Sequence, residues 1–266
     1  MIGKTFAGFT ILDHLSRGGM SDIFLATDAV GNRYTLRALL PELRQNSTRR
    51  RQFTWGCKVL ADLNHPNVIH LYQNGETDGI VYAILEYVDG PNLKERILRT
   101  DPGLKENRRL VLLGMAGGLA HVHDRGYLHL DFKPENVLVS RAYETKLIDF
   151  DLAVPRPAKP RRSPSSGTIA YWAPEQIARE PVDERADIFA YGVTAYEMIT
   201  GKKPVSGNTR EEVLEKYAEF DQHLVPLRDR VPDLPKNLEH VILKCLEQQV
   251  ARRYPSMSLV VRDLQS

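Results

Sequence analysis

The sequence has 266 residues, of which 42% are hydrophobic and 26% charged, with a formal net charge of +2 at pH 7. This length suits one large domain or two small lobes, and the near-neutral charge excludes a general attraction to nucleic acid or anionic membrane. No apolar run approaches the ~18 residues of a membrane span, and no signal peptide is recognisable. Cys57 and Cys245 lie alone in apolar stretches, which favours buried thiols in a reducing compartment. We therefore expect a cytoplasmic protein, or the cytosolic domain of a longer one.

The first part of the chain, up to Val88, is predicted to be rich in strands. A turn-forming run at 16–21 separates the first two apolar stretches and indicates a hairpin. One helix is predicted over 47–63, because Phe53 and Leu60 recur at helical spacing with their apolar neighbours. The predicted strands are 9–12, 22–26, 33–40, 68–73 and 80–88.

From residue 89 onward the pattern is mainly helical. The predicted helices are 104–125, 188–199, 210–220, 238–246 and 259–264, with short strands at 137–139 and 146–148. A proline-, serine- and arginine-rich stretch at 154–168 is predicted to be an exposed loop. A strand-rich front and a helix-rich back predict an α+β protein of two lobes, 1–88 and 89–266.

The most specific signal is the segment 129–136, with sequence HLDFKPEN. Phosphoryl transfer to a hydroxyl needs a carboxylate to accept the proton, a cation near the phosphoryl group and oxygen ligands for magnesium. Asp131, Lys133 and Asn136 supply these three groups from one short loop. Asp149 follows thirteen residues after Asn136, where a second metal carboxylate is expected.

With these motifs, the chain resembles the eukaryotic-like, bacterial-type serine/threonine protein kinases over essentially its whole length. The segment 167–175, GTIAYWAPE, resembles the end of the family's activation loop, and 187–192 resembles the helix that braces the catalytic loop. Arg253 stands where the family pairs an arginine with Glu175. The resemblance implies the bilobal kinase fold, with the activation segment at 149–175.

The resemblance also implies ATP and Mg²⁺ as cofactors and a protein as substrate or partner. Catalytic roles fall to Asp131, Lys133 and Asn136, and magnesium ligation to Asn136 and Asp149. The residues implied at the nucleotide are Ser16, Gly18, Ser21, Ile23, Thr35, Arg37, Glu86, Val88 and Leu138. Whether ATP binds is not decided by the sequence.

Several departures from the family pattern fall on the nucleotide side. The glycine-rich loop G-x-G-x-x-G keeps only Gly18 of its three glycines, because serines stand at 16 and 21. Arg37 replaces the third-strand lysine, and a guanidinium is larger, planar and forked. Thr35 replaces a small apolar residue over the adenine ring.

Two further departures concern charge. The helix glutamate that pairs with the family's lysine falls on Gly56, and no glutamate lies between Glu42 and Glu76 to replace it. The sequence therefore predicts that no carboxylate positions Arg37. The family's D-F-G becomes 149–151, DFD, and we interpret Asp151 as a cap of the following segment rather than a metal ligand.

The activation loop offers residues that resemble phosphorylation sites, but Leu130 replaces the arginine that grips a phosphorylated loop in many relatives. We therefore do not expect phosphorylation of the activation loop to control this protein in the way usual for the family. The residues concerned are Ser163, Ser165, Ser166 and Thr168, beside Arg161 and Arg162.

These patterns bear on three possible functions. The sequence favours a pseudokinase, a binding or regulatory module in signalling, because Gly56 and Arg37 together would misplace the phosphates. On this interpretation, the double change Arg37→Lys with Gly56→Glu should raise phosphotransfer. The alternative is a divergent but active serine/threonine kinase. A small-molecule phosphotransferase is disfavoured by the complete segment 173–175.

Overall fold

The computed structural model describes residues 2–156, 169–205, 207 and 210–266. These residues form two compact units, Met1–Asp89 with Asp149–Leu152, and Gly90–Ile148 with Ala153–Ser266. The segment 149–152, placed by the sequence in the larger lobe, thus packs within the smaller unit. The loop hydroxyls at 163, 165, 166 and 168, and the arginines beside them, lie outside the described residues.

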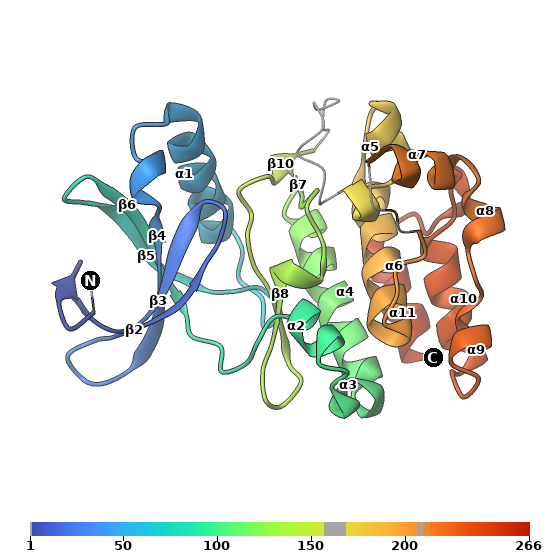
Figure 1. Ribbon diagram of the computed structural model, residues 1–266, viewed down its shortest axis with the longest axis horizontal. Coiled ribbons are helices and arrows are strands. Elements are labelled where there is room, and N and C mark those ends of the chain that lie inside the picture. Colours follow the sequence, from blue (N-terminus) through green and yellow to red (C-terminus); the bar gives the residue numbers. More distant parts are fainter. Residues whose placement is uncertain (1, 157–168, 206, 208–209) are drawn as a thin grey trace. The chain divides into compact units, whose positions relative to one another are not determined.

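The smaller unit contains a six-stranded antiparallel sheet in the order β1-β2-β3-β4-β6-β5 (Figure 1). Its hairpin from β5 to β6 turns at Asp78 and Gly79, which both have positive φ, as tight hairpin turns require. The strands are β1 (Thr5–Phe6), β2 (Phe9–Arg17), β3 (Ser21–Thr27), β4 (Arg33–Leu39), β5 (Leu71–Thr77) and β6 (Ile80–Glu86). The fifth strand begins three residues later than predicted, since Val68 and Ile69 are buried ahead of it outside the ladder.

The two faces of this sheet differ because side chains alternate along each strand. One face carries an apolar cluster that includes Phe24, Leu36 and Ile84. On the other face, Ile23 lies opposite Arg37 and Thr35 lies opposite Leu85. The register therefore places several of the predicted nucleotide residues on one surface of the sheet.

Helix α1 (Ser47–Ala61) begins where the side chain of Asn46 accepts hydrogen bonds from the backbone N–H groups of Thr48 and Arg49. Phe53, Gly56, Cys57 and Leu60 are buried, so one face of the helix packs into the unit. The helix predicted over 47–63 is confirmed, although it ends at Ala61.

The larger unit is mainly helical, which confirms the predicted α+β class. Helix α6 (Glu184–Thr200) is buried over nearly its whole length and contacts α4 and α10 (Figure 1). The other helices are α2 (Leu93–Leu98), α3 (Pro102–Glu106), α4 (Arg108–Asp124), α5 (Pro174–Ala178), α7 (Arg210–Ala218), α8 (Phe220–His223), α9 (Leu227–Arg230), α10 (Lys236–Cys245) and α11 (Met257–Gln265).

Short strands complete the larger unit as two two-stranded pairs, β8 with β9 and β7 with β10. Their bounds are β7 (Tyr127–Leu128), β8 (Val137–Val139), β9 (Thr145–Leu147) and β10 (Val154–Pro155). The single helix predicted over 104–125 is wrong in one respect, because Asn107 leaves helical geometry and separates α3 from α4. Among the described residues, we find no helix that is both long and apolar enough to cross a membrane.

Candidate active site

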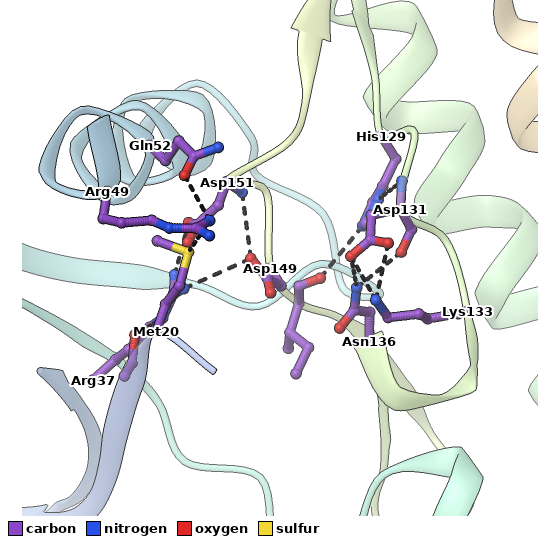
Figure 2. A network of polar contacts seen from close by, with 12 residues as sticks. Met20, Arg37, Arg49, Gln52, His129, Asp131, Lys133, Asn136, Asp149 and Asp151 are labelled. Atoms are coloured by element: carbon purple, nitrogen blue, oxygen red, sulfur yellow. Dashed lines mark hydrogen bonds and ion pairs between the residues drawn. The ribbon is translucent and has the colours of Figure 1, made fainter. Parts of the chain in front are cut away.

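The predicted catalytic groups of the larger unit lie together in the loop between β7 and β8. Lys133 Nζ donates to both carboxylate oxygens of Asp131, at 2.9 and 2.8 Å. Asn136 Nδ2 donates to the Asp131 backbone oxygen at 2.8 Å and to its Oδ2 at 3.0 Å. Figure 2 shows the side chains of Lys133 and Asn136 pointing toward the Asp131 carboxylate. The loop therefore holds the Asp131 carboxylate in one orientation.

Helix α6 anchors this loop through Asp187, whose side chain is fully buried. Its carboxylate accepts the backbone N–H groups of His129 and Leu130, both at 2.8 Å, and a hydrogen bond from His123 at 2.9 Å. Burial opposes the charge most strongly, yet the hydrogen bonds outweigh it and lower the pKa of Asp187. Leu130, held by one of these bonds, has a φ of 56°, a left-handed conformation uncommon for a bulky residue.

A second buried ion pair connects distant parts of the larger unit. Arg253 donates to Glu175 through both terminal nitrogens, at 2.6 and 2.8 Å. The remaining donors of Arg253 reach the backbone oxygens of Glu247, Arg185 and Gln248. The pairing expected from the resemblance is confirmed, and it holds the segment beginning at α5 to the region before α11.

In the smaller unit, the predicted nucleotide residues lie on or next to β2, β3 and β4 and at the end of β6. Gly18 N–H donates to Ser21 O at 2.9 Å and closes a tight turn between β2 and β3. Ser16 pairs with Ile23 across these strands. Glu86 ends β6, and its backbone N–H donates to His70 O at 2.9 Å. Val88 follows the strand and is half-buried.

Arg37, on β4, has the partner that the sequence did not predict. Its terminal nitrogens donate to the two carboxylate oxygens of Asp151 at 2.9 and 2.5 Å (Figure 2). Its Nε donates to Ser21 Oγ at 3.1 Å. The expectation that no carboxylate would position Arg37 is therefore wrong, and interpreting Asp151 as a cap missed this pairing. Burial opposes the charge of Arg37 most strongly, but Asp151 and Asp149 outweigh it and raise its pKa.

Asp149 lies beside this pair, with its Oδ1 3.7 Å from an Arg37 nitrogen and its side chain 38% exposed. It has a φ of 64°, which turns the chain sharply before Asp151. An accessible carboxylate suits a hard cation such as Mg²⁺, although Arg37 offsets part of its charge. In Asn136, the amide hydrogens face Asp131, so the amide oxygen is the atom that it would offer to a cation.

The predicted site residues thus fall into two groups. Asp131, Lys133, Asn136 and Leu138 belong to the larger unit, and the other predicted nucleotide and metal residues belong to the smaller one. Within the described residues, no cluster of three or more His, Cys, Asp or Glu side chains could hold a metal by itself. The functional residue missed as a partner was Asp151, and its only signal was an acid in place of the family's glycine.

Comparisons with known proteins agree with the resemblance. Residues 9–263 match the protein kinase domain family. The chain is 28% identical to the serine/threonine-protein kinase PrkC of Bacillus subtilis, covering 100% of this chain and 41% of that protein. It is 29% identical to PknJ of Mycobacterium tuberculosis, a serine/threonine-protein kinase, covering 96% of this chain and 44% of that protein.

Among solved structures, the kinase domain of Mycobacterium tuberculosis PknI is similar, with a TM-score of 0.72 and 28% identity. That match covers 100% of this chain and 98% of the other. The kinase fold predicted from the sequence is therefore confirmed. The chain spans less than half the length of the two curated relatives.

Proposed function

This chain belongs to the protein kinase domain family, and on that basis we propose that it is an active, divergent serine/threonine protein kinase. The reaction is transfer of the ATP γ-phosphoryl group to a Ser or Thr hydroxyl of a protein. The observation that carries this proposal is the ordered catalytic loop, in which Asp131 is held by Lys133 and Asn136. We also propose a cytoplasmic location, because two isolated cysteines suit a reducing compartment.

Asp131 is the base in this mechanism. Its carboxylate accepts the proton of the substrate hydroxyl as the hydroxyl oxygen forms a bond to the γ-phosphorus. The bond from phosphorus to the bridging oxygen breaks, and its electron pair leaves on ADP. Lys133, 2.8 Å from the Asp131 carboxylate, brings a positive charge to the place where negative charge develops on the phosphoryl oxygens. Asn136 keeps Asp131 oriented through two hydrogen bonds.

Asn136 and Asp149 would hold Mg²⁺, and Arg37 would face the phosphates from β4. Bound Mg²⁺ would supply neutralisation of phosphate charge. The guanidinium of Arg37 has five N–H donors, of which the hydrogen bonds to Ser21 and Asp151 use three. Arg37 therefore keeps donor capacity for a phosphate while its orientation is held by protein groups.

A pseudokinase is the second candidate, supported by the serines at 16 and 21 and by the 3.7 Å approach of Arg37 to Asp149. Its main ground in the sequence was the missing carboxylate beside Arg37, and Asp151 removes that ground. The active-kinase function is for this reason better supported by the geometry.

The test is incorporation of radiolabelled phosphate from ATP with Mg²⁺, into the protein itself and into casein. We expect Asp131→Asn to lower the rate by about a hundredfold or more, the usual contribution of a general base. Asp124→Asn, the same chemical change at an exposed acid at the end of α4, serves as the matched control. No incorporation by the parent protein would favour the pseudokinase, and equal incorporation by Asp131→Asn would overturn the proposal that Asp131 is the base of an active kinase.

A further inference from the structure

Four positions where the chain departs from the kinase pattern meet at one point of the smaller unit. They are Ser21, Arg37, Gly56 and Asp151. Ser21 and Asp151 accept hydrogen bonds from the guanidinium of Arg37, and Gly56 lies against Asp151. Ser21 accepts from Nε at 3.1 Å, and Asp151 accepts from the two terminal nitrogens at 2.9 and 2.5 Å. The ring of Phe53, on α1, lies 4.6 Å from the guanidinium carbon and covers one side of it.

Gly56 is the position on α1 that faces Asp151. A Cβ placed on Gly56 would lie 2.3 Å from Asp151 Oδ1, 3.1 Å from its backbone nitrogen and 3.2 Å from its Cα. Side chains at 56 and 151 therefore compete for one space. A glutamate on α1, as the family pattern has it, cannot coexist with the observed place of the Asp151 carboxylate.

The chemistry of Arg37 fits Asp151 and Ser21 in a way that a lysine would not. A guanidinium can donate in a fork to one carboxylate and, at the same time, from Nε to a third oxygen. A lysine ammonium is a single point charge and cannot span Ser21 and both oxygens of Asp151 in this geometry. The side chains of Arg37 and Asp151 are 13% and 4% exposed, so the pair is largely removed from water.

We propose that these four departures are one coupled exchange, which moves the ion-pair partner of the β4 cation from α1 to the segment 149–152. Asp151 is then the positioning residue for Arg37, and Gly56 is the position that admits it. This inference rests on the proposed function in one respect, that Arg37 faces the nucleotide phosphates. On this basis the orientation of Arg37 follows the start of the activation segment, two residues from Asp149, and no longer depends on a carboxylate of α1.

The first experiment compares ATP affinity in the whole 266-residue chain, by calorimetry with Mg²⁺. Asp151→Asn keeps the shape but removes the charge, and we expect the Kd for ATP to rise by about tenfold or more. The matched control is Asp78→Asn, at an exposed acid in the turn between β5 and β6 of the same unit. An unchanged Kd in Asp151→Asn would overturn the inference.

The second experiment moves the pair back to α1. The double variant Arg37→Lys with Gly56→Glu keeps Asp151. The sequence alone predicts a gain in phosphotransfer for this variant, but we now expect it to lose ATP affinity and to melt at a lower temperature than the parent protein, because residues 56 and 151 collide. Adding Asp151→Gly should recover both quantities, since the triple variant has the family's arrangement. A double variant as stable as the triple would contradict the exchange.

These outcomes separate the inference from the proposed function. Loss of phosphotransfer in Asp131→Asn tests the kinase activity, whereas ATP affinity and melting temperature test the ion pair even in a protein without phosphotransfer. If the parent protein does not bind ATP, the order of melting temperatures alone decides, with parent and triple variant expected above the double variant and the reverse order overturning the exchange.

Discussion

Replacing Gly56 by alanine tests the packing around Arg37 through the sign of a stability change. The new Cβ would lie 2.3 Å from Asp151 Oδ1 and 3.1 Å from the Asp151 backbone nitrogen. Since real Cβ contacts are essentially never under 3.0 Å, the carboxylate must move away from its place beside Arg37. The segment carrying Asp151 must also shift by a few tenths of an ångström.

Two opposing effects set the magnitude. Alanine forms helices better than glycine, which favours the variant by ~1 kcal/mol. Separating one partner of a buried ion pair costs ~3–5 kcal/mol. Asp149, 3.7 Å from Arg37, retains part of the charge compensation and reduces this cost. We therefore expect a net loss of roughly 1–3 kcal/mol, or about 2–10 °C in melting temperature for a chain of this size.

The assay is urea unfolding followed by tryptophan fluorescence, since Trp55 lies on α1 next to the mutated position. Thr54→Ala, at an exposed position of the same helix, controls for helix propensity. In an Asp151→Gly background, the loss caused by Gly56→Ala should largely disappear. A gain of ~1 kcal/mol for Gly56→Ala in the parent protein, as at an unconstrained helical site, would refute the reasoning.

Three other outcomes are expected. Glu175→Gln should lower the free energy of unfolding by about 3 kcal/mol, the low end for a buried pair, because three backbone oxygens still accept from Arg253; an unchanged urea midpoint would contradict this. Burial raises the pKa of the Cys57 thiol to about 11, so iodoacetamide at pH 7 should leave it unmodified by intact-mass analysis until denaturant is added. In the folded protein, the pKa of Asp187 lies below its ordinary value of 3.8. The stabilising contribution of the Asp187 carboxylate is therefore complete above pH 3.8, and it is lost as the pH falls through the lower pKa of the folded protein. Unfolding midpoints that do not fall with pH below about 4 would speak against this contribution.

Much of the catalytic loop could be predicted because its residues are close in sequence. Asp131, Lys133 and Asn136 lie within one short segment, so their side chains can meet through local geometry. The anchoring of the loop by Asp187 of α6 comes from the resemblance to the family and not from this local pattern. The brace between Glu175 and Arg253 was also expected, but from resemblance to a family and not from any local pattern.

The surroundings of Arg37 could not be predicted in the same way. Its partner Asp151 is separated from it by 114 positions in the chain, and the sequence alone does not say which acid reaches it. Taken singly, Gly56 suggested a missing carboxylate and Asp151 was interpreted as a cap. In the structure, the Asp151 carboxylate occupies the space that a side chain at position 56 would need, and it supplies the carboxylate that α1 lacks.

The composition of the smaller unit also affects how the protein can fold on the ribosome. Its segment Asp149–Leu152 is synthesised after the first part of the larger unit, so residues 1–89 emerge with Arg37 still lacking its counter-charge. At synthesis rates of ~5–20 residues per second, roughly 3–12 s pass before Asp151 follows. The Arg37–Asp151 ion pair of the smaller unit can therefore form only after residue 151 has been synthesised. A fragment that ends at Asp89 would lack Asp151 altogether.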